Sequence, residues 1–156
     1  MDSPAAARVA AALRELGATG EIRRLSTQVP TAAAAAAQLG CPVGAIANSL
    51  IFAADGAPLL VVTSGAHRVD TGRVATQLGA GKVKRADPRF VLEVTGQEVG
   101  GVAPVGYPAP VPALVDVWLS GHDVVWAGGG DHHTMFATSF DELLRMTGGT
   151  AAEVGD

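Results

Sequence analysis

The stretch SLIFAADGAPLLVVT, residues 49–63, constrains the fold more than any other part of this 156-residue chain. Two runs rich in β-branched and bulky apolar residues flank the dipeptide Asp55-Gly56. This dipeptide is a strong signal for a tight turn between two antiparallel strands. The sequence therefore predicts a β-hairpin in the core of the protein.

Five other segments carry helical signals, with capping residues before them and glycines after them. They cover residues 4–16, 32–39, 71–78, 88–95 and 140–149. The expected N-caps are Thr31, Asp70 or Thr71, Asp87 and Ser139, with Pro88 at the first helical position and Glu142 completing a capping box with Ser139. Short strands are expected at residues 22–25, 81–85, 111–119, 124–130 and 133–137.

This order of elements predicts a single domain over residues 1–156, of the α+β or mixed α/β class. Its sheet is expected to be mixed, largely antiparallel and surrounded by helices. A hydrophobic content of 48% suits one well-buried core, and the chain is too short for two comfortable domains. Residues 150–156 are expected to form a frayed tail.

The net charge of −4 argues against a protein that coats nucleic acid by bulk electrostatics. Six of the 11 Lys and Arg residues nevertheless lie in one short region, which permits a local contact; a solvated rim of helix and strand ends is the alternative. These residues are Arg68, Arg73, Lys82, Lys84, Arg85 and Arg89.

The single cysteine, Cys41, excludes an internal disulfide, so a reducing cytoplasm fits best. The N-terminal 20 residues lack the uninterrupted apolar run of a signal peptide. No segment reaches the roughly 20 apolar residues of a membrane span. We therefore expect a cytoplasmic protein without a membrane partner.

Side chains for metal or nucleophilic chemistry are few. His132 and His133 adjoin Asp131, and His122 adjoins Asp123, but adjacent residues of one strand point to opposite faces, so no metal is expected. The serines lack a Gly-x-Ser-x-Gly setting, and Cys41 shows no local sign of activation. A metal-dependent hydrolase built on the histidines is kept as a weaker alternative.

The segment QEVGGVAPVG, residues 97–106, holds paired glycines followed by Pro104. Gly100 and Gly101 permit close approach of the backbone, and Pro104 fixes the chain beyond them. Peptide N–H groups presented in this way hold a carbonyl or a developing oxyanion without a charged side chain. A structural turn between a helix and a strand is the alternative interpretation.

Four motifs in this order resemble the YbaK/EbsC/ProX family of aminoacyl-tRNA editing domains, which includes the insertion domain of bacterial prolyl-tRNA synthetases. They are SLIFAADGAPLLVVTSGAHRVD, VATQLGAGKVKRADP, the Gly-x-x-x-Pro pattern of residues 100–104, and AGGGDHHTMFATSFDELLRMTG, within residues 31–148. The resemblance implies a freestanding deacylase that hydrolyses the ester of a mischarged tRNA, usually proline tRNA, without a cofactor. It also implies water attack assisted by the terminal ribose hydroxyl, and leaves the amino acid open.

The resemblance also assigns site residues. Most relatives carry a lysine where this chain has Asn48, so a noncatalytic tRNA-binding or aminoacyl-binding module is the alternative to the deacylase. Asn48, Gly100 and Gly101 are the expected catalytic residues. Substrate binding is expected from Ser49, Pro104, His133, Arg68, Lys82, Lys84 and Arg85. The expected partners are the acceptor end of a mischarged tRNA and, through the family, prolyl-tRNA synthetase.

Overall fold

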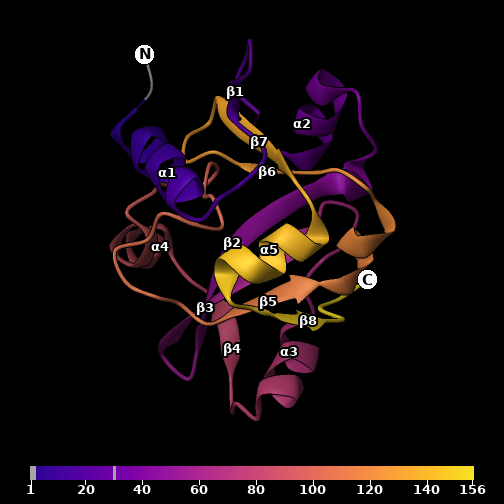
Figure 1. Cartoon of the computed structure of the whole chain (residues 1–156). Coiled ribbons are helices and arrows are strands. Elements are labelled where there is room, and N and C mark those ends of the chain that lie inside the picture. Colours follow the sequence, from indigo (N-terminus) through magenta and orange to yellow (C-terminus); the bar gives the residue numbers. More distant parts are fainter. Residues whose placement is uncertain (1–2, 30) are drawn as a thin grey trace.

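The computed structural model describes residues 3–29 and 31–156, whose strands form one eight-stranded mixed sheet (Figure 1). Met1, Asp2 and Pro30 of the expected 1–156 domain lie outside the described residues. The strand order is β1(Ile22–Arg24), β7(Thr134–Thr138), β6(Val125–Gly128), β2(Ile46–Ala54), β3(Ala57–Ser64), β5(Ala113–Asp116) and β8(Thr150–Ala152), with β4(Val83–Arg85) also pairing with β2. Four of these pairings are antiparallel and three are parallel, which confirms the predicted mixed, largely antiparallel sheet.

Helices cover both faces of this sheet. Residues of α1(Pro4–Glu15), α4(Pro88–Thr95) and α5(Phe140–Thr147) pack in one cluster with Ala47, Ile51 and Val62 of the hairpin. On the other face, α2(Ala32–Leu39) packs on Ile46 and α3(Thr71–Leu78) packs on Phe52. The alternation of β2 side chains between the two faces explains this division, because successive residues of a strand point to opposite sides. None of the described helices is both long and apolar enough to cross a membrane.

The predicted hairpin is confirmed. β2 and β3 pair from Ala47 and Ser64 to Ala54 and Ala57. Asp55 and Gly56 take left-handed backbone angles, φ 50° and 86°, as a tight turn between twisted strands requires. The Asp55 carboxylate accepts hydrogen bonds from the N–H groups of Gly81 and Lys82, and these bonds lower its pKa. The turn thereby also fixes the start of β4.

The predicted helix caps are largely confirmed. Thr31, Asp70, Asp87 and Ser139 each accept a hydrogen bond from a backbone N–H of the first turn. The capping box is only half formed, because the Glu142 carboxylate accepts from the hydroxyl of Thr138 at 2.7 Å instead of the Ser139 N–H. Glu142 therefore joins α5 to the end of β7.

Two expectations about the C-terminal half are wrong. The expected frayed tail instead forms β8 beside β5, and Val154 is fully buried against the core around α3. The N–H of Arg68 donates to the Asp156 carbonyl at 2.8 Å, which holds the last residue. The expected strand over residues 111–119 is only β5, followed by the 3-10 helix η2(Val117–Gly121), because the Asp116 carboxylate accepts from the Trp118 N–H and caps a turn there.

Candidate functional site

A gap in the sheet beside β2 creates the candidate site. One edge of β2 pairs with β3 along its length. On the other edge, β6 pairs only with Ile46 and Ala47, and β4 pairs only with residues 52–54. Residues 48–50 therefore have no strand beside them on this edge within the described chain.

The glycine-containing loop between α4 and β5 lies beside this gap and encloses a pocket of about 250 Å³. The pocket brings together five expected site residues: Asn48, Ser49, Arg85, Gly100 and Gly101. The remaining walls are largely apolar and come from α2, β2, β7 and the loop; they include Ala35, Ile46, Val102 and Met135. An adjoining pocket of about 300 Å³ shares Ser49, Leu50, Arg85, Val99, Gly100 and Val102, so the crevice continues along the gap.

The two glycines of the loop have different surroundings. Gly100 is exposed with φ 98°, and its N–H has no hydrogen-bond partner among the described residues. Gly101 is buried, its N–H is directed at the Glu98 carbonyl at 3.4 Å, and its carbonyl accepts from the Gly130 N–H at 2.9 Å. A Cβ on Gly101 would lie 2.4 Å from the carbonyl carbon of Asp131. Gly101 therefore lies where the backbones of two loops make close contact.

Gln97, which the sequence analysis did not single out, holds this loop in place. Its side chain is 1% exposed, accepts from the Ala103 N–H at 2.7 Å and donates to the Val105 carbonyl at 3.0 Å. Pro104 lies between these two residues but lines a different pocket, with Tyr107 and Met146. Pro104 thus belongs to the loop without lining the pocket at the gap. The role of Gln97 follows from the burial of its side chain, which a single sequence does not show.

Asp131 lines the pocket from the opposite loop. Its carboxylate accepts from the His133 N–H at 2.9 Å and from the hydroxyls of Thr134 and Ser3 at 2.9 and 2.8 Å. Partial burial raises the pKa of Asp131, but these hydrogen bonds and the nearby charge of Arg24 outweigh it, so the pKa is lowered. An ionised Asp131 therefore ties the loop before β7 to the start of α1.

The two histidines lie outside the pocket at the gap. His132 Nε2 is 3.0 Å from the Val99 carbonyl oxygen, and His133 lines a separate pocket of about 610 Å³ beside α1. Both precede β7 in a turn, where the sequence analysis had placed His133 in a strand. Across residues 3–29 and 31–156, no three His, Cys, Asp or Glu side chains are grouped as a metal site would need. Burial raises the pKa of the Cys41 thiol, and this residue does not line the pocket either.

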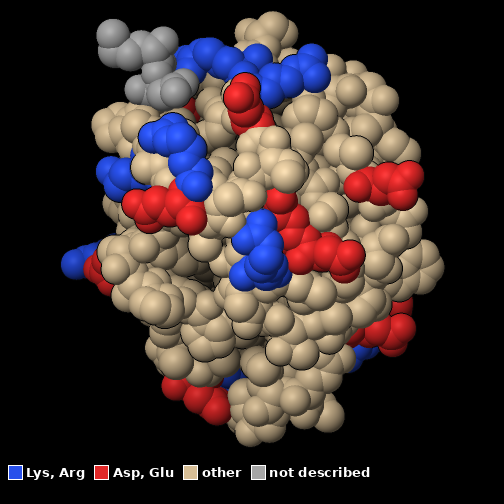
Figure 2. Space-filling model, in the orientation of Figure 1, with Lys and Arg blue, Asp and Glu red and all other residues tan. Residues whose placement is uncertain are grey.

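The expected tRNA-contacting cations divide between two ends of the hairpin. Arg85 lines the pocket, and its guanidinium carbon lies 6.0 Å from the centre of the Phe52 ring. Lys84 lies on β4 and Lys82 just before it, and both are exposed. Arg68 follows the far end of β3, next to the C-terminal residue. Figure 2 shows basic and acidic side chains interspersed on the face carrying α1 and α5, without one continuous basic surface.

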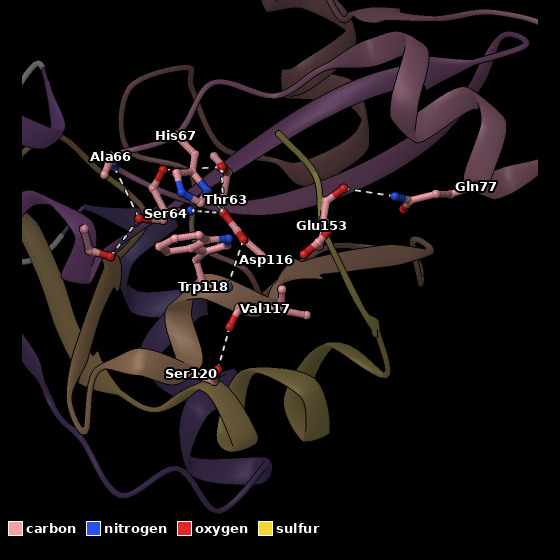
Figure 3. Close-up of polar contacts among 11 residues, drawn as sticks. Thr63, Ser64, Ala66, His67, Gln77, Asp116, Val117, Trp118, Ser120 and Glu153 are labelled. Atoms are coloured by element: carbon pink, nitrogen blue, oxygen red, sulfur yellow. Dashed lines mark hydrogen bonds and ion pairs between the residues drawn. The ribbon is translucent and has the colours of Figure 1, made fainter. Parts of the chain in front are cut away.

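A second polar cluster, also missed from the sequence, lies at the far end of β3 and β5 (Figure 3). The fully buried Asp116 carboxylate accepts from the N–H groups of Ser64 and Trp118, both at 3.0 Å, and from the Thr63 hydroxyl at 3.4 Å. His67 Nδ1 lies 2.8 Å from the same carboxylate. These residues are called the Asp116 network below, and none of them lines the pocket at the gap.

Comparison with known proteins shows the family of this chain. The model of the aminoacyl-tRNA editing domain family matches residues 26–146. The chain belongs to this family. The editing-domain relatives include the uncharacterized protein YwhH of Bacillus subtilis (strain 168), 29% identical over 128 residues that cover 81% of each chain.

Two further relatives of this editing domain concern proline tRNA. A solved protein described as a proposed trans-editing enzyme for prolyl tRNA synthetase is 36% identical, with a TM-score of 0.94 and coverage of 100% of this chain and 99% of the other. The proline–tRNA ligase of Bacillus pumilus (strain SAFR-032) is 38% identical over 88 residues. That match covers 55% of this chain but only 16% of the ligase, so the editing domain corresponds to a small part of the ligase.

Proposed function

We propose that this chain is a freestanding deacylase that hydrolyses the ester bond of a mischarged tRNA, with proline tRNA as the first substrate to test. The observation that carries the proposal is the pocket at the gap, where Asn48, Ser49 and Gly100 meet largely apolar walls. Family membership and the end-to-end similarity to a proposed trans-editing enzyme support it. Such an enzyme would act in the cytoplasm, where tRNA is charged.

The proposed reaction is attack of water on the ester carbonyl, which releases the amino acid and the tRNA. The N–H of Gly100, for which the described chain offers no hydrogen-bond acceptor, is suited to donate to the carbonyl oxygen, where negative charge develops. The Asn48 side chain offers both a donor and an acceptor, and we assign it the role of orienting the aminoacyl end or the attacking water. In the family, the terminal ribose hydroxyl of the substrate is expected to assist.

The surrounding residues are proposed to hold the tRNA and to shape the pocket. Arg85 lines the pocket, and the exposed Lys82 and Lys84 precede it closely in the chain; all three suit contacts with backbone phosphates. Gly101 and Pro104 keep the loop in its close approach to its neighbours. His133, in the neighbouring pocket, is proposed to contact the acceptor end outside the ester site.

A noncatalytic binding module is the second candidate, and Asn48 is the observation that favours it. Lysine supplies a positive charge suited to a phosphate or an oxyanion, whereas asparagine is neutral. An editing fold without this charge would still bind an aminoacyl end and pass it, for example, to prolyl-tRNA synthetase. Turnover therefore decides between the two candidates.

The test is deacylation of proline tRNA mischarged with alanine, serine, threonine or cysteine, with and without a chelator. We expect release of at least one amino acid, unaffected by chelation, and a lower rate with unchanged melting temperature in Asn48→Ala. Binding of these tRNAs without release would favour the noncatalytic module. Activity lost on chelation and restored by metal would favour the metal-dependent alternative and overturn the mechanism proposed here.

A further inference from the structure

Ser49, in the middle of β2, has a buried hydroxyl without a hydrogen-bond partner in the described part of the chain. The residue is 9% exposed, and its Oγ has no hydrogen-bond partner among the described residues. The buried hydroxyls of Thr63, Ser64, Thr95, Thr134 and Thr138 all have partners. An unpaired buried hydroxyl is costly and native proteins rarely keep one, so Ser49 requires an explanation.

The peptide groups of Ser49 also face the gap. Gly65 donates its N–H to the Ile46 carbonyl, so the residues of β2 that bond to β3 are Ile46 and every second residue after it. Ser49 lies between two of these and directs its N–H and C=O to the other edge. The Ile51 carbonyl, which shares this direction, accepts from the Ala86 N–H on that edge, as the alternation requires. Ser49 thus presents a hydroxyl and a peptide unit beside a crevice.

The position of this hydroxyl determines which part of a substrate would meet it. Ser49 shares its face of the sheet with Ala47 and Ile51, and pairs with the fully buried Val62, whereas Asn48 points to the other face. Its Oγ is therefore the polar atom on the core side of the crevice. A tRNA is too bulky to enter a pocket of about 250 Å³, so an ester bound near the opening would direct the amino-acid side chain inward.

We propose that Ser49 is the specificity-determining residue of the pocket, and that its hydroxyl bonds the side chain of the aminoacyl group. This inference rests on the proposed function. The preferred substrates then carry a short side chain that ends in a hydroxyl or a thiol. An alkyl side chain of the same size offers no polar group to the Ser49 hydroxyl and gains nothing from it. One net hydrogen bond corresponds to a preference of about tenfold.

The decisive experiment uses two nonhydrolysable probes, adenosine analogues that carry an L-seryl or an L-alanyl group through an amide at the 3′ position. Titration calorimetry on the parent protein should show about tenfold tighter binding of the seryl probe. Ser49→Ala should remove this preference while its melting temperature stays equal or rises, because an unpaired hydroxyl is lost. Ser49→Cys, which retains a weak donor, should keep part of the preference.

Ser64→Ala is the matched control. Ser64 is a buried serine of the neighbouring strand, 2% exposed, but its hydroxyl donates to the Gly44 carbonyl at 2.8 Å. Its removal should lower the melting temperature and leave the preference for the seryl probe intact. The opposite signs of the two stability changes distinguish a ligand-binding hydroxyl from a structural one.

Two results would overturn the inference while leaving the proposed function standing. One is equal binding of both probes by a parent protein that deacylates tRNA. The other is a Ser49→Ala protein that keeps the full seryl preference. A parent protein that binds neither probe and hydrolyses no mischarged tRNA would instead refute the proposed function, together with the inference that rests on it.

Discussion

The Asp116 network and the pocket at the gap are two polar regions on adjoining strands, and they differ in how their buried groups are satisfied. Asp116 is fully buried and has two backbone donors, a hydroxyl and a histidine ring around its carboxylate (Figure 3). Ser49 is 9% exposed, and its hydroxyl has no partner within residues 3–29 and 31–156. A saturated carboxylate has little left to offer a ligand, whereas an unsatisfied hydroxyl beside a crevice does.

One cross-strand pair connects the two regions. Thr63, which donates to Asp116, lies directly opposite Asn48 in the β2–β3 register. Directly opposed residues of antiparallel strands point to the same face and lie within contact distance. The Asp116 network therefore stiffens the strand that backs the candidate site, while the site itself keeps its polar groups available.

The largest expected effect is on stability, from Asp116→Ala. This change leaves the N–H groups of Ser64 and Trp118 and the ring of His67 without their shared acceptor. We expect a loss of about 3–5 kcal/mol in the free energy of unfolding, measured by urea denaturation. Asp123→Ala, at an exposed position after η2, is the control and should change stability little. A loss under about 1 kcal/mol for Asp116→Ala would mean that the hydrogen bonds of the Asp116 network do not stabilise the fold, contrary to the comparison drawn above.

The next effect is on activity, from Gly101→Ala. The added Cβ would meet the backbone of Asp131 at 2.4 Å, so the two loops that enclose the pocket must separate. A displacement of about 1 Å in a catalytic site costs on the order of 100-fold in rate, which we expect in the deacylation assay. The melting temperature should also fall, because Gly101 is buried. Gly121→Ala is the control, because its added Cβ would have no described residue other than its chain neighbours within 4 Å.

A parent-like rate in folded Gly101→Ala protein would contradict the role of this loop contact. The assay therefore needs a thermal melt of each variant beside it, because loss of folding and loss of the pocket both lower the rate. A variant that melts lower but is fully folded at the assay temperature separates the two causes.

Local signals made most of the fold predictable. Asp55-Gly56 and the capping residues Thr31 and Asp87 act through neighbours in sequence, and their predicted turn and helix starts are confirmed. The structured tail was not predictable in this way. Val154 is ordered by apolar contacts with residues far away in the chain, and β8 by pairing with β5.

The candidate site was only partly predictable for the same reason. The resemblance named Asn48, Ser49 and Gly100, which the structure brings together. Gln97 and Asp116 were missed because their roles depend on burial and on hydrogen-bond partners that lie 6 and 52 residues away in the sequence. The unsatisfied state of Ser49 is likewise a property of the folded environment: only the sheet gap distinguishes this serine from the paired Ser64.

The smallest expected effect concerns tRNA affinity, and it tests whether the pocket side alone contacts the nucleic acid. Lys82 and Lys84 are exposed near Arg85 and the pocket, whereas Arg68 lies by the Asp116 network at the far end of β3. Reversing the charge at both lysines should weaken binding by about tenfold at moderate salt and flatten its salt dependence, because phosphate contacts release counterions.

Arg68→Glu changes the charge by half as much as the double lysine variant does. Lys82→Glu and Lys84→Glu are therefore also made singly, as matched comparisons. Because Arg68 does not line the pocket, its reversal should leave the affinity and the salt dependence near those of the parent, and either single lysine change should weaken binding more. Equal losses from Arg68→Glu and Lys84→Glu would mean that the tRNA spans both ends of the hairpin. The Asp116 network would then lie beneath a binding surface, and its saturated hydrogen bonds would serve to hold Arg68 in place as well as to stabilise the strand behind Asn48.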